Sequence, residues 1–190
     1  MNTISSQSNR IHPHKFIMWV AICSICMMFA GLTSAYIVKK SQDNVISVEL
    51  PSLFWWSTII ILLSSVTIQI AVKSIKAKEM KRYRTFLGIT AFLGLLFATL
   101  QYLGFSTLHN HGVLFTGKNS NPGASFLLII IGLHALHILG GVVGLIVTFL
   151  KVYFSKIRNY SSIPVEVIAT YWHFVDILWI YLLIFLIFMR

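Results

Sequence analysis

Three ionisable side chains lie within eleven positions of a strongly apolar stretch near the C-terminus: Glu166, His173 and Asp176. On an α-helix, which turns about 100° per residue, Glu166 and His173 lie almost on one line, and Asp176 lies about 60° from His173. An ionisable group at membrane depth costs a few kcal/mol unless it has a partner. The pattern therefore predicts a polar stripe that faces protein and serves a function or an interface.

Two histidines, His134 and His137, show the same three-residue spacing as His173 and Asp176 and share one face of the preceding apolar helix. Such groups can hold a metal ion inside a helix bundle or supply axial ligands to haem. They also pair with one another simply to satisfy hydrogen bonds, and no further histidine-rich segment completes a coordination sphere. A structural polar network that docks the fourth and fifth helices is therefore favoured, with a haem or metal site at His134, His137 and His173 as the alternative. The predicted members of the network are His134, His137, Glu166, His173 and Asp176.

Proton transfer is an intermediate interpretation of the same stripe. Chains of Asp, Glu and His carry protons in membrane pumps, but a route needs polar groups across the full membrane thickness. Glu166 to Asp176 covers only about 15 Å of helix. The stripe could supply protons to a site that belongs to a partner. A small transporter is the third class of function, but the first three apolar stretches contain no deep charged residue that could coordinate a transported ion.

The composition is that of an integral membrane protein, with 57% hydrophobic residues, 11% charged residues and a mean hydropathy of +0.81. Cys23 and Cys26 lie inside an apolar run without basic neighbours, so we interpret them as small hydrophobic residues. The net charge of +10 comes from basic residues that bracket the apolar runs. Membrane topology explains this charge, and no nucleic-acid partner is expected.

We predict an all-α fold: a bundle of five transmembrane helices that forms one membrane domain, 16–190, after a polar cytoplasmic tail, 1–15. Each apolar stretch is long enough to cross a hydrocarbon core of about 30 Å at about 1.5 Å per residue. The predicted spans are approximately 16–38, 52–72, 86–108, 124–150 and 165–189.

The distribution of Lys and Arg predicts the orientation. With the N-terminus inside and the C-terminus outside, the inner segments carry eleven basic residues and the outer segments carry four. Cytoplasmic loops of membrane proteins show this excess.

Two further groups of residues are expected to position the helices. Small residues allow close helix contact, and tryptophans favour the membrane–water interface. The candidate packing residues are Gly132, Gly140, Gly141 and Gly144, and the candidate interface anchors are Trp55, Trp56, Trp172 and Trp179.

The motifs together resemble subunit III of haem-copper terminal oxidases, in its short five-helix bacterial form. The final-helix run Tyr-Trp-His-Phe-Val-Asp-x-x-Trp at 171–179, with Glu166 before it, carries the resemblance most specifically. The Gly-x-His-x-x-His run at 132–137, Leu-Gln at 100–101 and Ser-Ser-Val-Thr at 64–67 extend it over nearly the whole chain from Phe16.

The resemblance implies an accessory subunit of a multi-pass oxidase complex in the bacterial cytoplasmic (inner) membrane. Such a chain binds no haem or copper itself, packs against catalytic subunit I and the other oxidase subunits, and contacts membrane lipids, with room for structural phospholipid. Haem and copper in the catalytic subunit reduce oxygen to water, with cytochrome c favoured over quinol as the electron donor. The accessory subunit is expected to support proton uptake and to protect the complex during turnover.

Two departures from the family pattern limit what can be transferred. The first two of the seven helices found in many members are missing. Ile25 and Gly104 stand where the family has glutamates. Roles tied to those carboxylates, and the lipid-holding cleft built by the missing helices, are therefore not carried over to this chain.

Overall fold

Five long helices make up the computed structural model, which describes residues 13–42, 53–110, 122–154 and 162–188. They are α1 (Pro13–Gln42), α2 (Leu53–Lys76), α3 (Met80–Asn110), α4 (Pro122–Phe154) and α5 (Ile163–Phe188). Each is long and apolar enough to cross a membrane. The predicted number and order of the spans are confirmed. The main difference is that residues 13–15, assigned above to the tail, form the first turn of α1.

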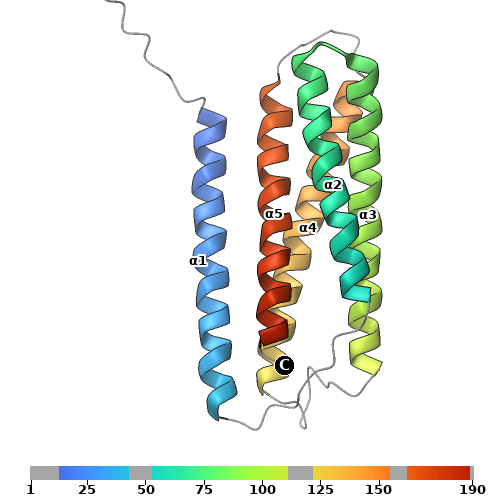
Figure 1. Cartoon of the computed structure of the whole chain (residues 1–190). Helices are drawn as coiled ribbons and strands as arrows, with labels where there is room; N and C mark the ends of the chain where they lie inside the picture. The colour runs from blue at the N-terminus through green and yellow to red at the C-terminus, as the bar shows by residue number, and fades with distance from the viewer. Residues whose placement is uncertain (1–12, 43–52, 111–121, 155–161, 189–190) are drawn as a thin grey trace, which may run out of the picture.

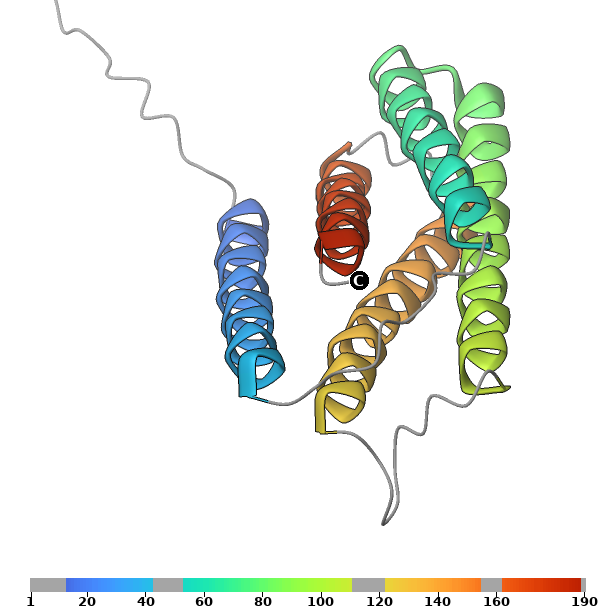
Figure 2. The same ribbon diagram turned by 60° about the horizontal axis from the view of Figure 1, so that its bottom comes forward.

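The helices pack as a bundle with α1 at its edge (Figures 1 and 2). Within the described residues α1 contacts α4 and α5, and it does not contact α2 or α3. Helices α2 and α3 have the most extensive contact, because the chain reverses between them in a short turn. Lys78 in this turn has a left-handed φ of 61°, the conformation in which helices commonly end.

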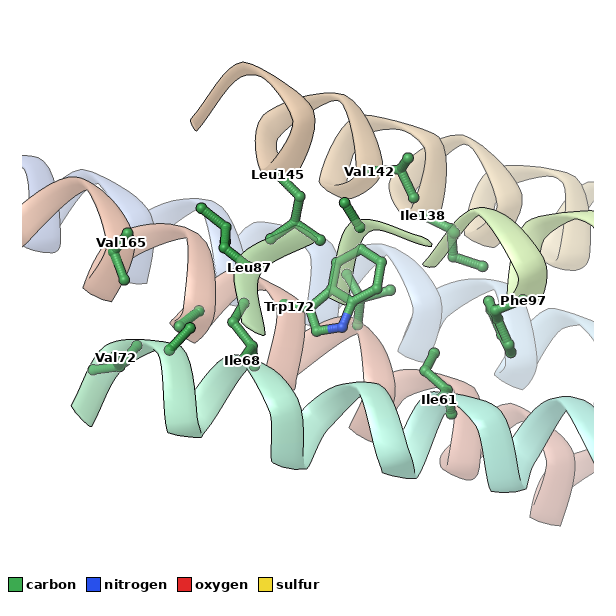
Figure 3. Close-up of a cluster of buried hydrophobic side chains, with 14 of the residues drawn as sticks. Ile61, Ile68, Val72, Leu87, Phe97, Ile138, Val142, Leu145, Val165 and Trp172 are labelled. Atoms are coloured by element: carbon green, nitrogen blue, oxygen red, sulfur yellow. The ribbon is translucent and has the colours of Figure 1, made fainter. Parts of the chain in front are cut away.

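The core of the bundle is built around Trp172 of α5, which is fully buried (Figure 3). A Cβ atom added to Gly94 of α3 would lie 2.8 Å from the indole ring, and one added to Gly141 of α4 would lie 3.0 Å from it. The indole N–H donates a hydrogen bond to the Ser64 hydroxyl of α2 over 3.0 Å. One side chain of α5 therefore contacts α2, α3 and α4, and the two glycines provide the space that it occupies.

A second tryptophan of α5, Trp179, repeats this arrangement two turns later. It is fully buried, and its indole N–H donates to Thr58 of α2 over 3.1 Å. Its ring packs against Phe54 and Phe97, with centroids 5.7 and 5.6 Å away. The prediction that Trp172 and Trp179 are interface anchors is wrong, because both belong to the core.

Trp55 and Trp56, by contrast, lie in the first turn of α2 and are 60% and 63% exposed. Their assignment to the membrane interface stays a prediction.

The four candidate packing glycines of α4 divide into two pairs. Gly141 and Gly144 lie against Trp172 and Ile168 of α5. A Cβ at Gly132 would meet nothing within 4 Å, and one at Gly140 would only reach Tyr171 Oη at 3.9 Å. The close α4–α5 contact therefore uses positions 141 and 144, and the assignment of Gly132 and Gly140 as packing residues stays a prediction.

Replacing Gly94 with alanine should destabilise the bundle, since the new methyl group would overlap the Trp172 ring in a fully packed core. We expect a loss of about 1–3 kcal/mol in the free energy of unfolding. Gly31→Ala is the matched control, because nothing lies within 4 Å of a Cβ there and alanine has the higher helix propensity. Thermal unfolding in detergent, followed by circular dichroism, measures both. Equal stability of the two variants would contradict the assigned role of Gly94.

Candidate functional site: the polar stripe of α5

Glu166 begins the polar stripe in the first turn of α5. Its carboxylate pairs with Lys15 of α1 at 2.5 Å and with Lys76 of α2 at 3.1 Å. The Ser162 hydroxyl, at the start of the same helix, donates to the carboxylate over 2.9 Å. One carboxylate thus joins three helices at the end of the bundle where α1, α3 and α5 begin (Figure 1).

His173 lies two turns further along α5 and contacts α2. Its Nδ1 is 2.6 Å from the Ser65 hydroxyl, and its Nε2 is 3.4 Å from Gln69 Oε1. An amide oxygen can only accept, so Nε2 is the donor to Gln69, and the Ser65 hydroxyl bonds Nδ1. The two contacts hold the imidazole ring in a fixed orientation against α2.

Asp176 is the deepest member of the stripe, with 3% of its surface exposed. Neither of its carboxyl oxygens has a hydrogen-bond partner among the described residues. A buried carboxyl without a partner is unusual, since burying even a neutral polar group without a hydrogen bond costs free energy.

A polar cleft of about 290 Å³ lies beside the stripe, between α1 and α2. Polar side chains of α1, α2 and α5 line the cleft: Lys15, Gln69, Lys76, Glu166, Thr170 and His173. It occupies the space left because α1 and α2 do not contact each other.

The two histidines of α4 are placed differently. His134 is 1% exposed, its ring stacks on Trp179 at a centroid distance of 5.5 Å, and neither of its nitrogens has a hydrogen-bond partner among the described residues. His137 Nδ1 lies 2.6 Å from the Leu133 carbonyl of its own helix, so this nitrogen is the donor. Tyr171 of α5 reaches α4 by donating to the backbone carbonyl of His137 over 3.0 Å.

These contacts correct the predicted pairing of the polar residues. His134 and Asp176 make no hydrogen bond with one another, and the bonded members of the stripe, Glu166 and His173, contact α1 and α2 instead of α4. No group of three or more His, Cys, Asp or Glu side chains that could hold a metal ion occurs within the described part of the chain. The alternative of a metal or haem site therefore gains no support from the geometry.

The residues that the sequence interpretation missed form a ladder along α2. Thr58 bonds Trp179, Ser64 bonds Trp172, Ser65 bonds His173 and Lys76 bonds Glu166, in antiparallel order. A signal existed in the run of small polar residues on this span, because such residues often bond across helices in membranes. The sequence did not reveal that their partners lie on α5.

Comparison with known proteins shows the family to which the chain belongs. Residues 14–189 match the family described as cytochrome c oxidase subunit III. The chain belongs to that family. It is therefore a multi-pass membrane protein and a subunit of a multi-subunit terminal oxidase, as its resemblance implied.

Individual relatives agree on the subunit and differ in the name of the oxidase. The chain is 31% identical over 166 residues to cytochrome c oxidase subunit 3 of Corynebacterium diphtheriae, which covers 83% of this chain and 79% of the relative. It is 28% identical over 176 residues to cytochrome bo(3) ubiquinol oxidase subunit 3 of Buchnera aphidicola, covering 86% and 85%. The Bacillus sp. PS3 cytochrome c oxidase subunit 3 is 25% identical over 175 residues, with coverages of 89% and 83%.

The ion pairs of Glu166 should help hold α1 in place. Glu166→Gln removes the charge that Lys15 and Lys76 share, and we expect a loss of about 1 kcal/mol in the free energy of unfolding, because both lysines are partly exposed. The difference should shrink in high salt. Thermal unfolding in detergent at low and high salt measures it.

Glu79→Gln is the matched control for this experiment, because Glu79 pairs with Arg82 of the same helical segment and both side chains are exposed. Its expected effect is below about 0.5 kcal/mol. An equal loss in the two variants would show that Glu166 does not join the helices as described.

Proposed function

We propose that the chain is a non-catalytic accessory subunit of a proton-pumping oxidase that reduces oxygen to water, docked against the catalytic subunit I that holds the haem and copper. The observation that carries the proposal is the set of contacts made by the α5 stripe. Glu166 and His173 bond α1 and α2 of the same chain, and the described residues of the stripe do not converge on a ligand site. The chemistry is then assigned to a partner.

The orientation with the N-terminus inside belongs to this proposal. The basic residues at the described helix ends support it, since Lys15, Lys73, Lys76, Arg82, Arg84 and Lys151 all lie at the end of the bundle where α1 begins. In a bacterial cytoplasmic membrane this end faces the cytoplasm. Alkaline phosphatase fused after Arg190 should be active, and a fluorescent protein fused there should be dark. The opposite pattern would reverse the orientation.

Support for proton uptake is the second part of the proposal. Glu166 and His173 both line the polar cleft, which begins at the basic end of the bundle, and His173 bonds Ser65 of α2. Residues in this arrangement can hold protons near the inner membrane surface and pass them to a neighbouring subunit. The stripe covers about 15 Å of helix and does not cross the membrane.

The polar cleft also suits a structural phospholipid. A phosphate group in the cleft would meet Lys15 and Lys76, which line it and carry one more positive charge than the Glu166 carboxylate that they share can neutralise. Phosphate binds Lys through charge-assisted hydrogen bonds.

Co-purification tests the proposal as a whole. Affinity purification of the tagged chain from native membranes, followed by mass spectrometry, should recover the catalytic subunit and the other oxidase subunits. The recovered complex should oxidise reduced cytochrome c in preference to a quinol. Recovery of the chain without an oxidase partner would overturn the accessory role. A Soret band or stoichiometric metal in the isolated chain that disappears with His134→Ala would support the haem or metal alternative.

Asp176→Asn should leave the chemistry of the complex intact and weaken its assembly. The carboxyl is buried in the bundle, and the described residues contain no group of His, Cys, Asp or Glu side chains that could hold a metal ion, so we expect unchanged haem content per complex. We expect lower retention of this subunit during purification, or faster loss of activity during turnover. Haem absorbance, subunit stoichiometry and the activity time course measure these effects. Loss of the haem signal with the subunit still bound would contradict the expectation.

A further inference from the structure

The beginning of α3 packs against the end of α4 at the basic end of the bundle. Arg84 of α3 donates from Nη2 to the main-chain carbonyl of Val152 in the last turn of α4, over 3.1 Å. One turn further along α3, a Cβ added to Gly88 would lie 3.3 Å from the ring of Phe149 on α4. The two helices are therefore antiparallel here, with Arg84 opposite Val152 and Gly88 opposite Phe149.

Two more side chains extend this contact surface. Lys81 precedes Gly88 by seven residues, which is two turns, so it lies on the same side of α3. Tyr153 follows Phe149 by four residues and stacks on its ring, with centroids 6.0 Å apart. Lys81 and Arg84 are exposed, and Tyr153 is 62% exposed. We name this surface, formed by Lys81, Arg84, Gly88, Phe149 and Tyr153, the α3–α4 seam.

The seam carries positive charge that no acidic side chain of its own helices balances. Neither α3 nor α4 contains an Asp or a Glu. The acidic residues described at this end of the bundle pair with other cations, Glu79 with Arg82 and Glu166 with Lys15 and Lys76. A ligand of the seam therefore needs negative charge, and the ammonium group of a zwitterionic ligand would find no carboxylate on either helix.

The seam lies at the depth of lipid headgroups. The apolar span of α3, Met80–Gly104, has 25 residues. Its length is roughly 37 Å, whereas the hydrocarbon core of a membrane is about 30 Å thick. The first turn of α3 and the last turn of α4 beside it therefore extend out of the hydrocarbon, where basic side chains and tyrosines meet the phosphate groups of lipids.

The outer face next to the basic groups is apolar. Phe92 and Leu95 follow Gly88 on the same side of α3 and are 67% and 46% exposed. Leu139 and Leu150 precede Tyr153 on the same side of α4 and are 50% and 43% exposed. Free phosphate or a soluble acidic protein would use the charges alone. A phospholipid uses both features, because its phosphate and its acyl chains lie at successive depths of the membrane.

We propose that the α3–α4 seam binds an anionic phospholipid whose headgroup carries no cationic group, such as phosphatidylglycerol. The phosphate lies between Lys81, Arg84 and Tyr153, and the acyl chains follow the apolar face of the two helices. A guanidinium group has several N–H donors, so Arg84 can bind the phosphate and the Val152 carbonyl together. This site is separate from the polar cleft, which lies between α1 and α2.

Photo-crosslinking of the purified oxidase complex in nanodiscs tests the proposal. One probe is a phosphatidylglycerol with a diazirine in one acyl chain, and the other is a phosphatidylcholine with the same diazirine. Peptide mass spectrometry locates the adducts. We expect the glycerol probe to label the outer face of α3 and α4 in the wild type about fivefold more than the choline probe, since one basic side chain near the membrane surface changes the affinity for an anionic lipid by about this factor.

Two lysine variants separate the seam from a general effect of charge. Lys81 and Lys151 are both exposed at the basic end of the bundle. Lys151 is two residues from both Phe149 and Tyr153, so it lies on the opposite side of α4 from the seam. Lys81→Gln should lower labelling by the glycerol probe about fivefold, and Lys151→Gln should leave it unchanged. Adding Arg84→Gln to Lys81→Gln should remove the preference for the glycerol probe.

Equal labelling of the wild type by the two probes overturns the proposal. So does equal labelling of Lys81→Gln and Lys151→Gln by the glycerol probe. Absence of adducts on α3 and α4 also overturns it, and this is the result expected if a partner subunit covers the seam.

Discussion

The close packing of Trp172 against two glycines and a serine is the contact on which the rest of the bundle depends. Apolar burial gives little preference for one helix arrangement over another in a membrane, because lipid tails are as apolar as the side chains. Shape and hydrogen bonding must therefore select the arrangement. Gly94 and Gly141 provide the shape, and Ser64 provides the hydrogen bond. Together they fix the rotation of α5 about its own axis, and with it the direction of every other side chain on that helix.

The polar stripe follows from this rotation. With Trp172 directed into the core, His173 on the next position faces Ser65 of α2, and Glu166 reaches Lys15 and Lys76. Interhelical hydrogen bonds in membranes contribute about 0.6 kcal/mol on average, so no single bond holds α5. The ladder of contacts with α2 is strong as a set, because the bonds extend from Thr58 to Lys76. A helix fastened in this way is a stable base for a subunit whose partner performs the chemistry.

Some buried polar groups remain without a full set of hydrogen bonds in the described part of the chain. Asp176, His134 and Gln101 are buried, and each has at least one polar atom without a partner among the described residues. Asp176 is the deepest member of the polar stripe, whereas Gln101 and His134 lie on α3 and α4.

The sequence by itself determined the number of helices, their order and the position of the ionisable residues on them. Runs of about 20 apolar residues can only be spans, and this criterion depends on local composition. It also determined the family, because the final-helix motif from Tyr171 to Trp179 is specific.

The tertiary structure alone decided which residues meet. All five helices are apolar around most of their circumference, so periodicity carries little information about which face of each helix is buried. Trp172 and Trp179 resembled interface anchors for this reason, and Gly140 resembled a packing residue although Gly141 is the one that contacts α5. The partners of Glu166 and His173 lie about a hundred or more positions away along the chain, at Lys15 and Ser65. Such pairings depend on the relative rotation of the helices, which close packing around Trp172 sets and which one-dimensional hydropathy does not encode.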